Sequence, residues 1–315
     1  MAVTRRNFLA VGSTGPDYIA AVLRLNAPAS RLRTSDLQNY VGARNLPVRI
    51  RGIDQPLSTY DIFVFWHVLA MSLGFSVGNA AHQGPIFLPW HRMYLIRFEE
   101  ALRRVTGTPN FALPYWDWAA DGELTGAAQV TAPIWNNSHL GSSRGFVTTG
   151  PLANFRVRLV QDASTGDLVS INPRPLRRDA GAGTRRLPRK ADVAVALAPA
   201  IYDAPPWSIA AIGHRNRNEG WLNGPQMHNR VHVWVGGDMS PGSSPNDPVF
   251  FLNHCNVDRI WERWMTDKGR IYAPGAGQGP AGHRINDTMV SIIGAAMTPQ
   301  QVLDVSQSYT YDTLN

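Results

Sequence analysis

Apolar residues recur at helical spacing in three long stretches, and these stretches predict the helices of the core. The first runs from about Ser58 to Leu73, and the second opens at Pro89 and Trp90. The third carries Phe250, Phe251, Val257, Ile260, Trp261 and Trp264. Residues three or four apart lie on one face of a helix. The pattern therefore predicts a mainly α-helical protein whose long helices share one core.

Shorter elements are expected around these helices. We expect an edge strand at the N-terminus, a helix from Asp17 to Leu25 and another from Lys190 to Ile201. Residues 26–60 and 119–190 mix polar residues with proline and glycine, which predicts loops and short strands. No linker or repeat divides the chain, so residues 1–315 are expected to form a single domain.

The histidines indicate a possible metal site because six of them occur in two groups of three. His228 and His232 stand four residues apart, so both rings can lie on one helix face and hold one metal ion. That spacing is common on helices that bind nothing, and the pair alone is weak evidence. The third helical stretch adds His254, and the upstream part of the chain offers a second triplet: His67, His82 and His91. His82 falls in a loop and the other five on helices.

The ligand type narrows the choice of metal. Neutral imidazoles suit zinc, copper, iron and nickel, and a set without carboxylates disfavours magnesium, calcium and manganese. A three-histidine zinc site, as in a hydrolase, is one alternative. Two adjacent sites favour copper, because three imidazoles stabilise Cu(I) and leave an open position for dioxygen. Of the remaining histidines, we expect His139 and His283 to be exposed, and His214 is a weak candidate for substrate contact.

Several motifs carry a resemblance to a known family. They are F-L-P-W-H-R followed by F-E-E-A-L, L-P-Y-W-D-W, Y-D-A-P-P-W, E-G-W, H-N-R-V-H-V-W-V-G-G, S-P-N-D-P-V-F-F and H-C-N-V-D-R-I-W. With these motifs in this order, the chain resembles the type-3 copper family of tyrosinases, catechol oxidases and o-aminophenol oxidases, especially its short bacterial members. The resemblance covers nearly the whole chain, and the motifs are specific.

The resemblance implies a fold, a cofactor and an activity. The fold is an antiparallel four-helix bundle that holds a dicopper centre, with small peripheral strands and long loops. The two triplets would bind two copper ions, with O2 as co-substrate. The implied activity is oxidation of small o-diphenols or o-aminophenols to o-quinones or quinone imines, together with ortho-hydroxylation of monophenols.

Individual roles follow from the same resemblance. Glu219 would hold a water near the second copper and Asn229 would orient it, so that the water accepts a phenol's proton. Phe250 would pack on a ligand imidazole, and Asp258 would brace the site from behind.

This chain has distinctive residues at the expected substrate entrance and next to the histidine ligand His254. By the same resemblance, Ser243 falls where the family has its gate residue above the first copper and Val233 lines the same entrance, so we expect an open mouth without a charged anchor for a substrate carboxylate. Asn253 stands where most bacterial relatives have a histidine before the ligand His254, which places monophenol hydroxylation in question. A haemocyanin-like dioxygen carrier is the alternative, but the segment after Trp264 is too short for the β-sandwich domain of molluscan carriers.

Composition limits partners and location. The net charge is +7, mostly from arginine, but the aromatic residues lie in apolar helices, so no nucleic-acid partner is expected. A basic run from Arg174 to Lys190, including Arg178, predicts a solvated surface. The sole cysteine, Cys255, excludes an internal disulfide and is expected to be buried.

The expected location rests on hydropathy at the start of the chain. No stretch approaches the roughly 20 apolar residues of a membrane span. The segment T-R-R-N-F-L at residues 4–9 resembles an export signal, but the apolar run after it is brief. We therefore expect a cytoplasmic enzyme, with secretion by co-export with a copper-loading caddie protein as the alternative.

Overall fold

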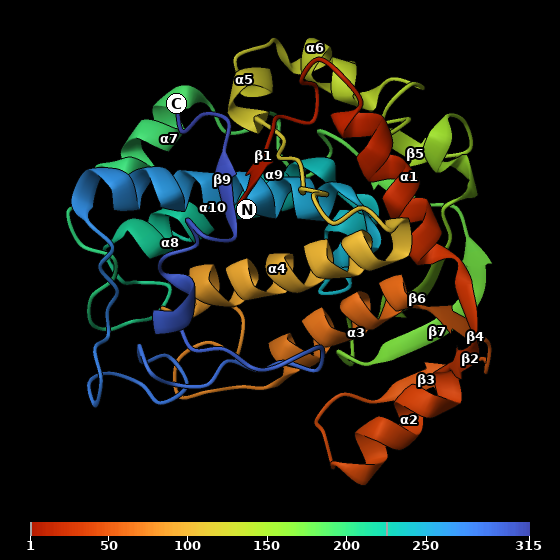
Figure 1. Cartoon of the computed structure of the whole chain (residues 1–315), viewed down its shortest axis with the longest axis horizontal. Coiled ribbons are helices and arrows are strands. Elements are labelled where there is room, and N and C mark those ends of the chain that lie inside the picture. The colour runs from red at the N-terminus through yellow and green to blue at the C-terminus, as the bar shows by residue number, and fades with distance from the viewer. Residues whose placement is uncertain (1, 225) are drawn as a thin grey trace.

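The long helices form a bundle at the centre of the molecule (Figure 1). In this computed structural model, residues 2–224 and 226–315 are described. The bundle consists of α3 (Thr59–Ser72), α4 (Phe87–Thr106), α9 (Met227–Val235) and α10 (Val249–Lys268), and α1 (Thr14–Asn26) packs on α3 and α4. The mainly helical bundle predicted from the sequence is confirmed. The shorter helices are α2 (Thr34–Ala43), α5 (Trp118–Gly122), α6 (Gly126–Val130), α7 (Lys190–Leu197) and α8 (His214–Glu219).

Short strands lie around the bundle in four small sheets. Strand β1 (Val3–Arg5) pairs in parallel with β9 (Tyr309–Tyr311), which brings the two ends of the chain together against the helices (Figure 1). Strand β3 (Ile50–Gly52) pairs with β7 (Leu168–Arg174), which also pairs with β6 (Val157–Gln161). The two remaining sheets are β2 (Pro28–Arg33) with β4 (Pro56–Ser58), and β5 (Arg144–Phe146) with β8 (Arg177–Asp179).

Local sequence explains where the central helices begin and end. A capping box starts α3: the Ser58 hydroxyl accepts from the backbone N–H of Asp61, whose carboxylate accepts from the Ser58 N–H at 2.7 Å. Helix α4 stops at Gly107, whose φ of +67° suits a residue without Cβ. These boundaries set where α3 begins and where α4 ends, and the two helices carry His67 and His91.

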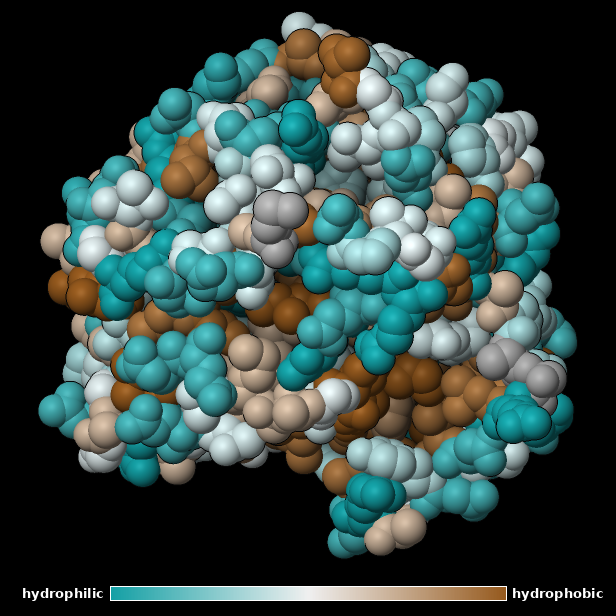
Figure 2. All heavy atoms as spheres, in the orientation of Figure 1, coloured by the Kyte–Doolittle hydropathy of each residue, from teal (hydrophilic) through white to brown (hydrophobic). Residues whose placement is uncertain are grey.

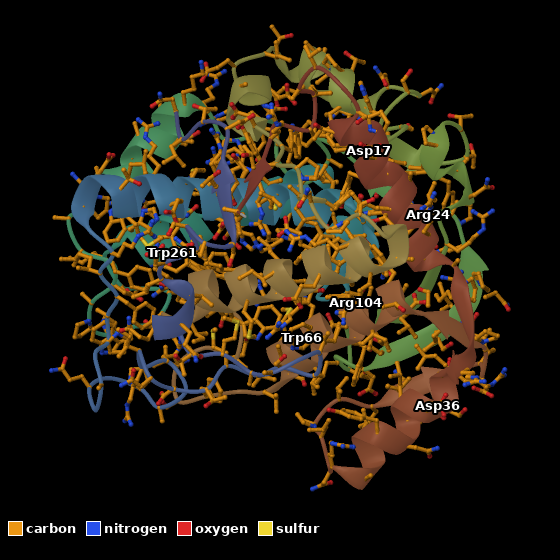
Figure 3. All side chains as sticks on the ribbon, in the orientation of Figure 1. Asp17, Arg24, Asp36, Trp66, Arg104 and Trp261 are labelled. Carbon is orange, nitrogen blue, oxygen red and sulfur yellow. The ribbon has the colours of Figure 1, made fainter. Side chains whose placement is uncertain are left out.

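Aromatic side chains fill the space between the bundle helices. Phe98 of α4 stacks on Phe251 of α10 with ring centroids 3.4 Å apart, and Phe63 of α3 meets Phe98 edge-on at 5.0 Å. The side chains of Trp66 and Trp261 are fully buried in the core. The charged side chains labelled in Figure 3 (Asp17, Arg24, Asp36 and Arg104) are exposed at the surface. Figure 2 shows a mainly polar face with an apolar hollow between α2 and the bundle.

Two sequence expectations about boundaries and exposure are wrong. Helix α7 ends at Leu197 instead of Ile201, because Pro199 lacks the N–H that would continue the helix. His283 is buried, not exposed: one ring nitrogen donates to the carbonyl of Val77 at 2.8 Å and the other accepts from the N–H of Ile86 at 3.3 Å. A ring whose two nitrogens are both paired can be buried at little cost.

The basic run between β7 and α7 also differs from expectation at one residue. Arg178 has no exposed surface and forms a bidentate ion pair with Asp247, just before α10. Arg177, by contrast, keeps about half of its side chain exposed. Alternation along strand β8 turns one arginine inward and its neighbour outward, and the sequence pattern of a charged run hides this. Among the described residues, no helix combines the length and apolar character that crossing a bilayer requires.

Candidate metal centre

Two ligands of the first triplet are held by helix backbones. His67 lies on α3 and donates from Nδ1 to the carbonyl of Gly242 at 2.6 Å, and His91 lies on α4 and donates from Nδ1 to the carbonyl of Phe87 at 2.8 Å. These bonds fix the tautomer, so that Nε2 of each ring carries a lone pair. Both Nε2 atoms are buried and have no protein partner among the described residues.

The third ligand, His82, comes from the loop between α3 and α4, as the sequence predicts. Asn79 Oδ1 accepts from the backbone N–H groups of Ala81 and His82 at 3.0 and 2.9 Å. On the other side, the N–H of Gln83 donates to Glu219 Oε1 at 2.7 Å. Anchors on both sides therefore hold a loop ligand that has no helix to position it.

The second triplet lies on α9 and α10. His228 and His232 occupy one face of α9; His228 donates from Nδ1 to Asn229 Oδ1 at 3.0 Å, and His232 donates from Nδ1 to the carbonyl of Met239 at 2.7 Å. His254 comes from α10, and its Nε2 lies 3.1 Å from Nε2 of His228. Two imidazole nitrogens this close can share one proton or bind one cation between them.

The six rings fit a pair of metal ions. Within each triplet, one ligand atom per ring lies within 4.8 Å of the others. The triplets adjoin each other, since the His91 and His254 rings stack with centroids 4.2 Å apart. Burial lowers the pKa of all six rings, that of His67 to about 3 and that of His232 to about 4, so they are neutral at pH 7. Neutral nitrogen donors without a carboxylate suit copper.

A cavity of about 480 Å³ opens above the imidazoles. Its lining residues are His67, Met71, Asn79, His82, Gln83, Trp221, Gly224, His228, Asn229, His232, Val233, Ser240, Pro241, Gly242 and Ser244. Asn229 and Val233 are among these lining residues. Met71, Asn79, Gln83 and Trp221 were not identified from the sequence, although Met71 follows His67 by one helical turn and Gln83 directly follows His82.

Phe250 and Ser243 lie behind the cavity wall. Phe250 is fully buried, and its ring centroid lies 4.1 Å from that of His254 and 5.1 Å from that of His67, so it packs on ligands of both triplets. The Ser243 side chain is also buried, and its hydroxyl accepts from the N–H of Gln161 at 3.0 Å. Its neighbours Gly242 and Ser244 line the cavity, so the placement does not support Ser243 as the gate.

Glu219 is a fully buried carboxylate at the C-terminal end of α8. Besides the N–H of Gln83, it accepts from Arg215 Nη1 at 3.0 Å, and Arg215 also pairs with Asp203 at 2.8 Å. Burial raises the pKa of Glu219, and Arg215 opposes that rise. A carboxylate can accept up to four hydrogen bonds, so each Glu219 oxygen can still accept another.

Asp258 follows His254 by one helical turn and anchors α10 behind the metal centre. Its carboxylate pairs with Arg92 at 2.5 Å and Arg5 at 3.4 Å, and it accepts from the hydroxyls of Tyr309 and Tyr311, each at 2.6 Å. Burial alone would raise the pKa of Asp258, but the two guanidinium groups lower it below its ordinary value. The strands β1 and β9 are thereby tied to the helix that carries His254.

Asn253 and His214 lie away from the cavity. Asn253 is fully buried, and neither of its amide atoms has a protein partner among the described residues. His214 donates from Nδ1 to the carbonyl of Ala196 at 2.8 Å and stacks on Trp264 with centroids 4.8 Å apart. It is a core residue, and the weak expectation of substrate contact is not supported.

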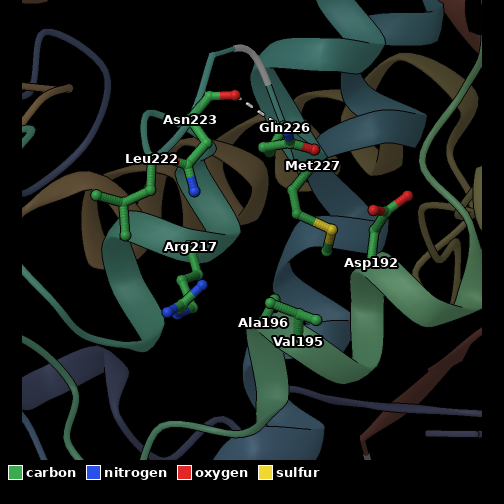
Figure 4. A pocket seen from close by; sticks show the side chains of 8 residues that line it. All are labelled: Asp192, Val195, Ala196, Arg217, Leu222, Asn223, Gln226 and Met227. Carbon is green, nitrogen blue, oxygen red and sulfur yellow. Dashed lines mark hydrogen bonds between the residues drawn. The ribbon is translucent and has the colours of Figure 1, made fainter.

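A smaller cavity of about 180 Å³ lies between α7, α8 and the start of α9 (Figure 4). Arg217, Asp192 and Met227 line it, and none of the six imidazoles does. Leu222 and Asn223 contribute to this cavity, whereas Trp221 and Gly224 of the same loop line the larger one. The larger cavity, which four of the six imidazoles line, is therefore the candidate for the chemistry.

Comparisons with known proteins agree with this geometry. Residues 57–267 match the common central domain of tyrosinase. The chain is 42% identical over 260 residues to a tyrosinase of Streptomyces glaucescens, which covers 81% of this chain and 89% of the relative. It is 32% identical over 306 residues to grixazone synthase of Streptomyces griseus subsp. griseus, which covers 85% and 92%.

Solved structures of related proteins have a similar fold. A polyphenol oxidase variant of Thermothelomyces thermophila has a TM-score of 0.72 at 23% identity, covering 99% of this chain and 89% of that chain. A functional unit of octopus haemocyanin has a TM-score of 0.54 at 19% identity, covering 100% and 69%. The match to the central domain, on a bundle that brings two histidine triplets together, shows that this chain belongs to the tyrosinase family, the copper-dependent polyphenol oxidases.

Proposed function

We propose that this enzyme uses O2 to oxidise o-diphenols and o-aminophenols to o-quinones and quinone imines, and that it hydroxylates monophenols more slowly. The observation that carries the proposal is an open cavity, large enough for an aromatic ring, lined by His67, His82, His228 and His232, which are two neutral imidazoles from each triplet. The relatives named tyrosinase and grixazone synthase support oxidation of phenolic rings.

The protein's own groups bind the substrate and move its proton. Copper held by the six imidazoles would supply electron transfer from the ring to dioxygen. Each o-diphenol loses two electrons and two protons, and one O2 accepts four of each to become two waters. We assign Glu219 the role of base, acting through a water oriented by Asn229, because burial raises its pKa toward the working pH. Phe250 keeps ligand rings fixed, and Val233 flanks the incoming ring.

Monophenol hydroxylation depends on how closely a phenolate can approach the second triplet. Asn253 is buried away from the cavity, so it leaves the approach past Val233 and Asn229 open. We propose that hydroxylation is retained and that Asn253 lowers its rate by changing the packing beside His254.

Turnover of three matched substrates tests the proposal. Copper-reconstituted protein is offered a para-substituted monophenol, the matching catechol and the matching o-aminophenol, with copper-stripped protein as the control. We expect rapid oxidation of the catechol and the aminophenol, and slower oxidation of the monophenol after a lag. Dioxygen binding without turnover of any substrate would favour the haemocyanin-like alternative, whereas a monophenol that alone fails to react would limit the proposal to diphenol chemistry.

Copper delivery and location are further proposals. The imidazoles lie at the base of the cavity, which supports loading through its mouth by a small copper-carrying partner. We propose that the enzyme acts in the cytoplasm. Immunodetection in cell fractions tests the location, and complete loading by free copper at physiological concentration would argue against a dedicated partner.

A further inference from the structure

The large cavity offers a substrate no side chain of Asp, Glu, Lys or Arg among its described lining residues. The walls on which a ring can lie are Met71, Trp221, Val233 and Pro241. A charged ring substituent that lies against these walls loses hydration without gaining a countercharge from a side chain. The charge of the bound metal ions would act first on the phenol oxygen, which approaches them, and less on a substituent at the far end of the ring.

The charged residues behind the wall do not line the cavity. Glu219 is fully buried, and its two oxygens accept from the Gln83 N–H and from Arg215. Arg215 in turn pairs with Asp203 and has no exposed side-chain surface. This ion-pair cluster holds the loop after His82 in place, and none of its three members lines the cavity, so a substrate's ammonium or carboxylate group meets none of them directly.

Gln83 is the side chain of this loop best placed to contact a substituent of the ring. It follows the ligand His82, its own N–H is anchored to Glu219, and its partly buried side chain lines the cavity. The side-chain amide has no partner among the described residues. Its position relative to the metal ligands is therefore fixed, while one donor group and one acceptor group remain free.

The backbone at Gln83 adds an independent indication of function. Its φ is +65°, in the left-handed region where glycine is the least strained residue. The chain places glutamine there and glycine at the next position, Gly84. Strain kept at a cavity wall points to a role for the side chain that causes it.

We propose that this cavity selects phenols whose ring substituent is uncharged and forms hydrogen bonds, such as a carboxamide or an aldehyde, and that Gln83 is the specificity-determining residue. The inference rests on the proposed oxidation of phenolic rings. It means that phenolic amino acids, phenolic acids and phenolic amines are poorer substrates than neutral amides of the same size.

A series of four catechols with side chains of equal length tests the selection. The side chains end in a primary amide, a methyl group, a carboxylate and an ammonium group. We expect kcat/KM for the amide to exceed that for either charged compound by at least about ten-fold, as the loss of a charged group's hydration requires. Binding of the matching monophenols, measured by calorimetry in the absence of dioxygen, should follow the same order.

Variants at Gln83 test the residue. Gln83→Met keeps the length and a similar backbone strain but removes both hydrogen-bonding groups, so the preference for the amide over the methyl compound should fall about five- to ten-fold, the worth of one hydrogen bond. Gln83→Glu should shift the preference toward the ammonium compound. Gln300→Met, at an exposed glutamine far along the chain, is the matched control and should keep the wild-type preference.

The outcomes separate this inference from the proposed function. If unsubstituted catechol is oxidised but the carboxylate or ammonium compound reacts and binds as well as the amide, the selection for neutral substituents is wrong. If the amide preference persists in Gln83→Met, selection occurs without Gln83 and its assignment is wrong. If unsubstituted catechol is not oxidised by the copper-loaded protein, the proposed function fails, and calorimetry without dioxygen still decides the order of binding.

Discussion

Replacing Arg178 by methionine would break a buried ion pair that the sequence does not reveal. Arg178 and Asp247 have no exposed side-chain surface. Arg178 donates to the two carboxylate oxygens of Asp247 at 2.6 and 2.8 Å, and to the carbonyls of Leu140 and Ser142 at 2.8 and 3.1 Å. Methionine fills much of the same volume and makes none of these bonds.

The cost follows from the groups left behind. Removing one partner of a buried pair costs about 3 to 5 kcal/mol, because here the Asp247 carboxylate would remain buried without a countercharge. An unfolding entropy of about 2.1 cal/mol/K per residue gives about 0.7 kcal/mol/K for 315 residues. A loss of about 4 kcal/mol therefore lowers Tm by about 6 °C.

The neighbouring residue supplies a matched control. Arg177 pairs with Asp179, and their side chains are 48% and 34% exposed. Arg177→Met should therefore cost less than about 1 kcal/mol. The double variant Arg178→Met/Asp247→Leu removes both buried charges and should recover much of the stability lost in Arg178→Met.

Urea unfolding of the copper-free protein measures these differences. Copper is left out because a ligand that binds only the folded state would mask them. The reasoning is refuted if Arg178→Met lies within 1 kcal/mol of Arg177→Met. It is also refuted if the double variant is no more stable than Arg178→Met alone.

Three further results are expected. Glu219→Gln should lower kcat/KM for a monophenol by about 10² to 10⁴ while both copper ions are retained. The control variant Glu100→Gln, at a partly exposed residue, should leave kcat/KM unchanged. Loss of copper in Glu219→Gln would contradict the role of Glu219 as a base. Elemental analysis should find about one copper per chain in His254→Ala, and two would show that it is not an essential ligand. The copper-free protein should lose stability as the pH falls below about 6.5, because burial lowers the pKa of His67 to about 3 and only the unfolded chain takes up that proton. The slope should be shallower in His67→Leu, and an unchanged slope would argue against this origin.

Periodicity predicts the long helices well, and short motifs single out the histidines that the structure gathers in two triplets. The apolar spacing of residues 58–73 and the third apolar stretch become α3 and α10, because a helical face must be apolar to be buried. His228 and His232 meet on one face of α9 by helical geometry alone. The resemblance supplies His82, whose loop has no periodicity from which its direction could be predicted.

Burial and pairing depend on contacts between distant segments, and the sequence misses them. His283 reads as an exposed loop residue but is buried because backbone groups of Val77 and Ile86 pair with its ring. Ser243 was expected at the cavity mouth, yet its hydroxyl accepts from Gln161 on β6. Neither partner is near in sequence.

The sequence by itself determined the helical bundle, the six imidazoles and the family, because each depends on residue type and on spacing within one element. Only the tertiary structure decided which charged groups are buried in pairs and which side chains line the cavity. It turned Arg178 inward and Arg177 outward, and it placed Gln83 beside the metal ligands with its N–H fixed by Glu219. The physical reason is that desolvation and hydrogen bonding depend on the neighbours that folding brings together, which a one-dimensional pattern does not contain.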